Sequence, residues 1–413
     1  MTGSKGDRLM PLTENTPKPL LTIKDKSIIY IMYESIVNNI KKCLPSRVKS
    51  YAVHEPTLSQ KVKKEVEKCI QSTYVSSSGD YINKLSSYLK EITGSKYILL
   101  TTSGTSALFC ALNEIDIQDQ EVIVPSMTFV ATANSVIYAG GTPVFLDSSK
   151  ESLNIDKDIL QKYLDENYKI LNGRCINNKT KKIIKCIVVV HAYGAAANIN
   201  AICKIAKKYN IEVIEDAAGA LGSYICNKHV GTISRMGILS FNGNKIITTG
   251  MGGALIVKNK RDYESISHKI STARVKHNWK VEHNMVGYNL RMANINAALG
   301  YGQIIDFEEI LIKKKKLYES YCDIFSNNKY CYIKKSAKEA SNNNWVTNLY
   351  LKDKYKSKHQ LLIKSLHKNN LMVRELWKPM HLLPMFKNLA HGKMINSIKS
   401  WKTGFSLPSS YYK

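Results

Sequence analysis

The sequence of 413 residues lacks features that define several classes of protein. No apolar run approaches the roughly 20 residues that cross a bilayer, and the opening MTGSKGDRLMPL has no apolar core of a secretion signal. The nine cysteines are scattered and include no CxxC pair, which argues against a disulfide framework and a structural zinc site. These absences predict a cytoplasmic protein with no membrane span and no metal.

Acidic residues are also scarce, since 33 Asp and Glu stand against 60 Lys and Arg, giving a net charge of +27. Such an excess can indicate nucleic-acid binding. The lysines are spread along the whole chain, however, and the only dense runs lie at 179–185 and 313–316. We interpret the charge mainly as solvated surface, so nucleic acid is an unlikely partner, and an anionic small-molecule substrate is favoured.

The length allows two domains on one framework, and a hydrophobic fraction of 44% is that of a globular protein. We expect an N-terminal arm and helix over 1–52, a large domain over 53–300 and a small domain over 301–413. Periodicity predicts one long helix from Ala297 to about Phe325, and a helix followed by a lysine-rich loop over 156–185.

Short apolar strands alternate with helices through the large domain, which predicts an α/β fold with a parallel sheet covered on both faces. Ligands bind such sheets at the carboxyl ends of the strands. Several polar or aromatic residues follow predicted strands directly and are candidates for one site: Ser103 to Thr105, Phe129, His191, Asp216 and Lys245.

Lys245 lies between two apolar strands, after the turn Asn242-Gly243-Asn244. Burial of an ammonium group is costly, so it lowers the pKa and yields a nucleophilic amine suited to a Schiff base. A solvated loop lysine remains the alternative in a chain so rich in lysine. The Ser103–Thr105 segment, between a strand and a helix, can likewise be a phosphate cup or an ordinary helix cap.

Five motifs in order resemble the DegT/DnrJ/EryC1/StrS family of fold-type I sugar aminotransferases. They are SGTSAL (103–108), PSMTFVATANSV (125–136), IEDAAGALGS (214–223), SFNGNKIITTGMGGALIV (240–257) and GYNLRMANINAALG (287–300). The resemblance implies a large domain with a mostly parallel mixed sheet, and a smaller α+β C-terminal domain. Four further segments are most similar to the legionaminic acid and bacillosamine branch: HEPTLSQ (54–60), VSSSGDYI (75–82), HKISTARVKHNW (268–279) and RELWKPMHLLPMF (374–386).

The resemblance implies pyridoxal 5'-phosphate as cofactor, with Lys245 as the Schiff-base lysine and proton shuttle and Asp216 paired with the pyridine nitrogen. Phe129 would stack on the ring and His191 would lie near it, while Asn289 would reach the phosphate of a neighbouring subunit in a homodimer with shared sites. The implied phosphate ligands are Gly104, Thr105 and Ser240. The implied nucleotide-sugar contacts are Ser77, Gly79, Lys276, His277, Arg374, Trp377 and His381.

The implied reaction moves an amino group from L-glutamate to C4 of a nucleotide-linked, UDP-type 4-keto-6-deoxy-N-acetylhexosamine, for surface glycans. Two alternatives remain: an aminotransferase like GDP-perosamine synthase, and a non-catalytic regulatory or nucleic-acid-binding member of the fold. The dehydratase branch has histidine in place of the lysine, so Lys245 argues against it. Four features depart from the family's pattern: Gly219 in place of a polar residue, Met251, the loss of polar residues in the segment after His191, and a C-terminus where relatives continue into a helix.

Overall fold

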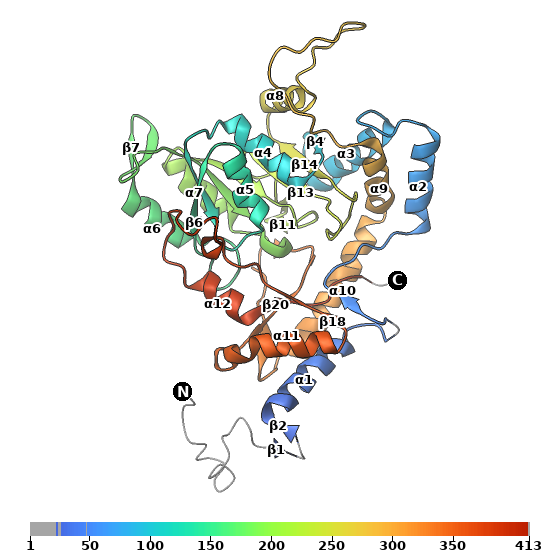
Figure 1. Ribbon diagram of the computed structural model, residues 1–413, viewed down its shortest axis with the longest axis vertical. Coiled ribbons are helices and arrows are strands. Elements are labelled where there is room, and N and C mark those ends of the chain that lie inside the picture. Colours follow the sequence, from blue (N-terminus) through green and yellow to red (C-terminus); the bar gives the residue numbers. More distant parts are fainter. Residues whose placement is uncertain (1–21, 24–25, 47, 412–413) are drawn as a thin grey trace.

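The computed structural model describes residues 22–23, 26–46 and 48–411 (Figure 1). Its centre is a seven-stranded sheet in the order β4-β14-β13-β10-β9-β5-β6. The strands are β4 (Tyr97–Thr101), β5 (Glu121–Pro125), β6 (Thr142–Leu146), β9 (Ile184–Val190), β10 (Glu212–Asp216), β13 (Met236–Ser240) and β14 (Gly253–Val257). Only β14 runs antiparallel to its neighbours in this sheet. The predicted, mostly parallel α/β sheet is confirmed.

Helices cover both faces of the sheet, which explains why its strands are apolar on both sides. One face packs against α4 (Gly104–Ile115), α5 (Val130–Tyr138) and α8 (Lys260–Ile270). The other face packs against α3 (Asp80–Thr93), α6 (Lys157–Asn167), α7 (Ile199–Lys208) and α9 (Asn294–Ile304), and α2 (Gln60–Gln71) packs on α9. The sheet is therefore the middle layer of three, and its strand ends are held rigidly.

One sequence prediction needs correction, and one element was not predicted. The expected single helix over 297–325 is two helices, α9 and α10 (Phe307–Phe325), separated at Ile305 and Asp306. The predicted helix over 156–185 is α6, and the lysine-rich loop lies at 178–182, but an unpredicted β-hairpin of β7 (Tyr168–Leu171) and β8 (Arg174–Asn177) lies between them. Its end is held by the buried Glu121 carboxylate, which accepts hydrogen bonds from the Tyr168 hydroxyl and the Asn177 amide.

The C-terminal part contains a four-stranded sheet, β15-β17-β20-β19, with α11 (His359–Lys368) and α12 (Asn396–Thr403). Its core includes the inner side of α1 (Ile28–Lys42), so the N-terminal helix and the C-terminal elements share apolar packing. Its strands are β15 (Cys331–Ile333), β17 (Asn348–Leu351), β19 (Arg374–Glu375) and β20 (Gly404–Ser406). The expected boundaries at 52 and 300 remain a prediction.

The remaining strands are short. β1 (Thr22–Ile23) pairs with β2 (Lys26–Ser27), β3 (Tyr51–Ala52) pairs with β18 (Leu371–Met372), and β11 (Tyr224–Ile225) lies between β12 (Lys228–His229) and β16 (Ala340–Ser341) in a three-stranded sheet. The rest of the expected N-terminal arm lies outside the described residues. Among the residues that the structure describes, no helix is both long and apolar enough to cross a membrane, and no cluster of His, Cys, Asp and Glu could hold a metal ion. All nine cysteines are described, and all are free thiols.

Candidate active site

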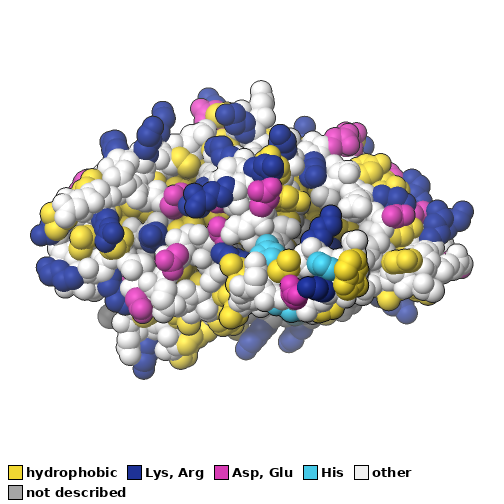
Figure 2. Space-filling model, turned by 90° about the horizontal axis from the view of Figure 1, so that it is seen from above, with side chains coloured by type: hydrophobic (Ala, Val, Ile, Leu, Met, Phe, Trp, Pro, Cys, Tyr) yellow, Lys and Arg dark blue, Asp and Glu magenta, His cyan; other side chains and the backbone are white. Residues whose placement is uncertain are grey.

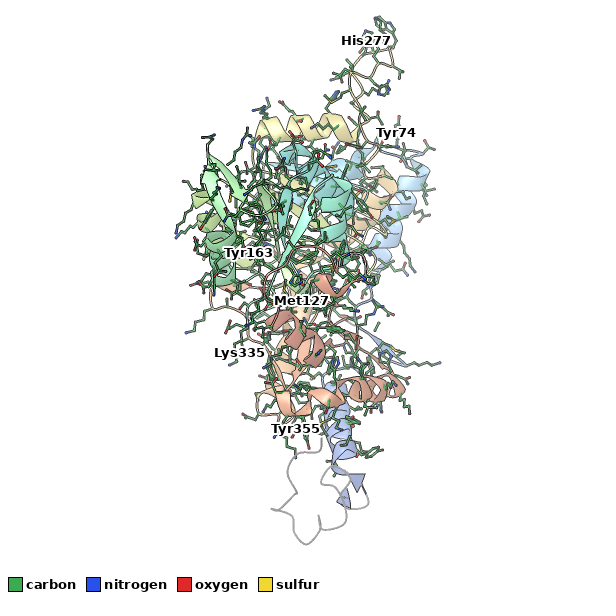
Figure 3. All side chains as sticks on the ribbon, turned by 60° about the vertical axis from the view of Figure 1, so that its left-hand side comes forward. Tyr74, Met127, Tyr163, His277, Lys335 and Tyr355 are labelled. Carbon is green, nitrogen blue, oxygen red and sulfur yellow. The ribbon has the colours of Figure 1, made fainter. Side chains whose placement is uncertain are left out.

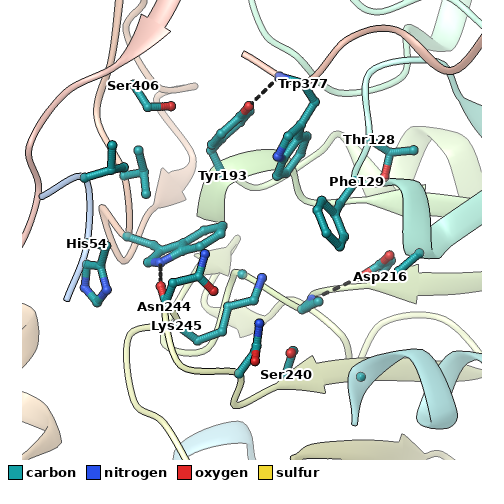
Figure 4. A pocket seen from close by; sticks show the side chains of 18 of the residues that line it. His54, Thr128, Phe129, Tyr193, Asp216, Ser240, Asn244, Lys245, Trp377 and Ser406 are labelled. Atoms are coloured by element: carbon teal, nitrogen blue, oxygen red, sulfur yellow. Dashed lines mark hydrogen bonds between the residues drawn. The ribbon is translucent and has the colours of Figure 1, made fainter. Parts of the chain in front are cut away.

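A cavity of about 610 Å³ opens at the carboxyl ends of the parallel strands (Figure 4). Its walls come from the loops after β4, β5, β9, β10 and β13, and from C-terminal residues around β19 and β20. The cavity therefore lies between the large sheet and the C-terminal elements. Ten of the candidate site residues predicted from the sequence line it: Ser103, Gly104, Thr105, Phe129, His191, Asp216, Ser240, Lys245, Arg374 and Trp377.

Lys245 projects into this cavity from the turn after β13, where its backbone N–H donates to the Asn242 carbonyl (2.9 Å). Burial lowers the pKa of the Lys245 amine to about 8, against an opposing effect from the charge of Asp216. The amine lies 4.1 Å from the centre of the Trp345 ring, over its face. A much larger fraction of this amine than of an ordinary lysine is therefore neutral, and so nucleophilic, near neutral pH.

Asp216 ends β10 and faces the same cavity. Its carboxylate accepts a hydrogen bond from the Thr132 hydroxyl (2.8 Å) and another from the Ala218 N–H (3.2 Å). Thr132 is in turn hydrogen-bonded to Thr128 (2.8 Å). The carboxylate is thus held in one orientation and is suited to pairing with a protonated ring nitrogen.

The start of α4 forms an anion-binding cup. Ser103 caps the helix, its hydroxyl accepting from the Ser106 N–H (3.0 Å). A Cβ on Gly104 would lie 2.8 Å from the Ser240 Cβ, so only glycine lets the helix start approach β13 so closely. Thr105 and Ser240 line the cavity beside this helix start, an arrangement of hydroxyls and helix N–H groups that suits an anion.

His191 follows β9 and is buried, with both ring nitrogens bonded to protein. Nδ1 accepts from the Ala197 N–H (3.0 Å), which leaves Nε2 to donate to Glu215 (3.1 Å). Burial opposes ionisation of Glu215, but hydrogen bonds from His191 and from the Ser234 and Gly231 N–H groups hold its pKa below the ordinary value. The ring thus supports the strand end that carries Asp216.

Four aromatic rings line one side of the cavity. Tyr193 stacks on Trp377 with ring centres 4.0 Å apart, and its hydroxyl accepts from the Trp377 N–H (2.9 Å). Trp345 lies on the other side of Tyr193 (6.4 Å), and Phe129 is 6.2 Å from Trp377. Tyr193 adopts a left-handed conformation (φ 55°), which is uncommon for a non-glycine residue and concentrates at functional sites.

The structure does not bring the other expected residues into this cavity. His381 lies outside the lining and is hydrogen-bonded to Ser126 (2.7 Å). Ser77 and Gly79 belong to the turn before α3. Lys276, His277 and Asn289 belong to a projecting segment, residues 271–289, closed at its base by the Ser271–Asn289 bridge and called the arm below. Figure 3 shows His277 at its far end, well away from the body of the molecule.

Sequence reasoning missed several residues that line or support the cavity. Trp345 and Thr132 contact Lys245 and Asp216 across more than 80 positions of sequence, and no local signal marks them. His54 lines the cavity with its ring buried and neither nitrogen hydrogen-bonded. Burial and the charges of Lys314 and Lys245 lower its pKa, so this imidazole is neutral. Only the HEPTLSQ resemblance drew attention to its segment.

Comparison with known proteins agrees with this geometry. Residues 56–411 match the model of the DegT/DnrJ/EryC1/StrS aminotransferase family. A nucleotidyl transferase model also matches residues 1–82, a small part of the chain. The chain is 32% identical to a GDP-perosamine synthase of Escherichia coli O157:H7 over 88% of this chain and 94% of that protein. It is 27% identical to a UDP-4-amino-4,6-dideoxy-N-acetyl-beta-L-altrosamine transaminase of Helicobacter pylori over 87% and 93%.

Among solved structures, Helicobacter pylori PseC, an aminotransferase involved in pseudaminic acid biosynthesis, superposes with a TM-score of 0.79 at 26% identity, covering 87% of this chain and 94% of that one. The fold and the cavity together define the class, a fold-type I aminotransferase. Within that class, the chain belongs to the DegT/DnrJ/EryC1/StrS aminotransferase family. The expected family and enzyme class are confirmed.

Proposed function

We propose that the cavity binds pyridoxal 5'-phosphate and that the enzyme transfers an amino group from L-glutamate to C4 of a UDP-linked 4-keto-6-deoxy-N-acetylhexosamine. The observation that carries this proposal is the convergence of the Lys245 amine, the Asp216 carboxylate and the α4 cup on one cavity. When bound, the cofactor supplies a carbonyl that takes up the amino group and a ring that acts as an electron sink.

The chain's own residues then have separate roles. The α4 cup and Ser240 would hold the phosphate, and Asp216 would keep the ring nitrogen protonated. The exposed face of Phe129, whose side chain is 57% exposed, is free to stack on the ring. The Lys245 amine would hold the cofactor and then move a proton between donor and acceptor carbons, since its lowered pKa allows both protonation states.

The arm supports a homodimer with shared sites. It carries exposed apolar side chains on a segment that makes few contacts with its own subunit: Trp279, Val281, Met285 and Val286. Trp279 is 79% exposed and Val286 87%, values unusual for such residues in an isolated protein. We therefore place the Asn289, Lys276 and His277 contacts, and the phosphate role of Asn289, at a neighbouring subunit's cavity.

The decisive experiment is incubation of the purified protein with cofactor, L-glutamate and a panel of UDP- and GDP-linked 4-keto-6-deoxy sugars. We expect a 4-amino-4,6-dideoxy product from a UDP-linked N-acetylhexosamine, identified by mass and NMR. K245A should lose turnover and the visible absorbance of bound cofactor. Failure to produce an amino sugar from any member of the panel would overturn the proposal.

GDP-linked sugar is the second candidate, because three curated GDP-perosamine synthases are 30–32% identical to the chain over at least 87% of its length. The same panel of UDP- and GDP-linked sugars distinguishes the two candidate substrates. A GDP-4-keto-6-deoxy sugar converted much faster than every UDP-linked sugar would establish the second candidate in place of the first.

A further inference from the structure

The turn that carries Lys245 is contacted by a segment distant in sequence, residues 342–346, which precedes β17 in the C-terminal part. The contact is made by Trp345. Its indole Nε1–H donates to the carbonyl of Asn244 (2.7 Å), the residue directly before the lysine. The face of the same ring lies 4.1 Å from the Lys245 amine. One side chain therefore touches both the backbone and the reactive atom of the lysine turn.

Trp345 is itself fixed by buried polar groups. Its backbone N–H donates to the Asn343 side-chain oxygen (3.0 Å), and its carbonyl accepts from Lys314 Nζ (2.7 Å). Lys314 and Asn343 are both about 1% exposed. The Asn343 amide also donates to the carbonyls of Gly219 (2.9 Å) and Leu221 (2.8 Å). These bonds tie the Trp345 backbone to the loop after Asp216.

Gly219 supplies the space in which the indole lies. A Cβ at this position would lie 2.6 Å from Trp345 Cε3 and 2.7 Å from Cζ3, distances that real Cβ atoms do not adopt. The indole lies between the Gly219 backbone and the Lys245 turn, and a rigid ring cannot bend away from an added Cβ. A side chain at 219 and the observed indole position are therefore mutually exclusive.

We propose that Trp345 is a positioning residue for Lys245: its indole holds the lysine turn and shields one side of the amine from water. Gly219, which has no side chain, leaves the space that the indole occupies. This inference rests on the proposed function for its relevance to catalysis. It can be tested in the absence of cofactor, because the contacts are made by the chain alone.

The first test measures Lys245 in the cofactor-free protein. Reductive methylation at a series of pH values, read by peptide mass spectrometry, gives the pH midpoint of its reactivity, which should lie near the pKa of about 8. In W345A we expect the midpoint to rise by about one pH unit or more, because water reaches the amine. Loss of the attraction between the ammonium group and the ring face acts the other way, but desolvation is the largest cause of the lowered pKa.

W345F keeps an aromatic face but loses the Nε1–H, so its midpoint should lie between those of the wild type and W345A. W401A is the matched control, since Trp401 lies on α12 and does not line the cavity. It should leave the midpoint unchanged. A W345A midpoint equal to that of wild type contradicts the proposal.

The second test uses Gly219. G219A should displace the indole and raise the midpoint in the same direction as W345A. In the double variant G219A/W345A, the alanine at 219 should not shift the pH midpoint further than W345A alone, because the indole that it would displace is absent. Fully additive shifts would mean that Gly219 acts independently of Trp345 and would refute the coupling. If W345A fails to fold, an unchanged midpoint in both G219A and W345F overturns the proposal.

Kinetics then separate this inference from the proposed function. In the loaded enzyme, W345F should lower kcat several-fold with little change in KM for glutamate, because positioning of the amine affects proton transfer more than donor binding. An enzyme that transaminates but shows normal kcat in W345F and W345A refutes the positioning role alone. A protein that transaminates nothing refutes the proposed function, while the labelling midpoints still report on Trp345.

Discussion

At the scale of single residues, the lowered pKa of Lys245 has a measurable consequence for pH dependence. Only the neutral amine attacks a carbonyl, so the rate of cofactor attachment should rise as the pH increases through about 8 and then level off. An ordinary lysine would give a rate that keeps rising to about pH 10.4. Stopped-flow absorbance measured on the cofactor-free enzyme distinguishes the two profiles.

Glu215 provides a second prediction at this scale. Its carboxylate is fully buried and accepts hydrogen bonds from His191 and from three backbone N–H groups, those of Gly231, Ile233 and Ser234. E215A leaves these donors unpaired and should lower the free energy of unfolding by about 3–5 kcal/mol, measured by urea denaturation. E264A, at an exposed pair on α8, should change it by less than about 0.5 kcal/mol. Equal effects would show that the buried cluster is not stabilising.

The residues that local sequence could indicate are those that follow strands. Lys245 and Asp216 come directly after apolar runs, and parallel strands bring such positions to one edge, so their shared cavity follows from pattern and topology. Trp345 and His54 had no such signal. Each reaches the cavity from a segment outside the seven-stranded sheet, through contacts between positions about 100 or more apart in sequence.

At the scale of elements, α12 depends on one carboxylate. Asp147, at the end of β6, accepts hydrogen bonds from the N–H groups of Ile395, Asn396 and Ser397 at the start of that helix. These donors have no partner within the helix, and the negative charge also complements the helix dipole. The helix is thereby tied to the large sheet.

D147A should therefore destabilise the protein by about 2–4 kcal/mol and increase hydrogen exchange in α12 specifically. D353A is the matched control, because it removes the exposed ion pair that Asp353 forms with Lys399 of the same helix. It should lower the free energy of unfolding by less than about 1 kcal/mol. If hydrogen exchange in α12 is the same in D147A as in the wild type, Asp147 does not hold this helix to the sheet.

The elements that the sequence pattern placed wrongly or missed lacked a local signal. Apolar periodicity continues from α9 into α10, so nothing in it marked the break at Ile305 and Asp306. The β7–β8 hairpin is largely exposed, so no alternation of apolar residues predicted it; the buried Glu121 carboxylate beneath it accepts hydrogen bonds from Tyr168 and Asn177. By contrast, the strands of the central sheet are buried on both faces, and their apolar runs predicted them within a few residues.

At the scale of the whole molecule, the arm gives a test of assembly. W279D and V286D place charges on exposed apolar positions, and we expect each to convert a dimer to a monomer, measured by sedimentation velocity. L361D, on α11 at the opposite end of the molecule in Figure 1, should leave the dimer intact. A monomeric wild type would contradict the shared-site proposal.

The surface charge concerns the molecule as a whole. Figure 2 shows Lys and Arg side chains distributed over the visible face with Asp and Glu among them, rather than gathered into one basic groove. Binding to DNA should therefore be weak and sensitive to salt. Tight duplex binding at 150 mM salt without cofactor uptake would instead favour the non-catalytic alternative; fluorescence anisotropy measures it.

If the arm completes the cavity of a neighbouring subunit, as proposed, two differently inactivated subunits should restore activity to one another. A K245A subunit keeps Asn289 in its arm, and an N289A subunit keeps Lys245 in its cavity. In a mixed dimer, the cavity that contains Lys245 therefore receives an intact arm from the other subunit. After the two inactive preparations are unfolded, mixed and refolded together, half of the dimers are hybrids with one intact centre, and about a quarter of the wild-type turnover should return. Such complementation is impossible for a catalyst whose centre is built from one polypeptide.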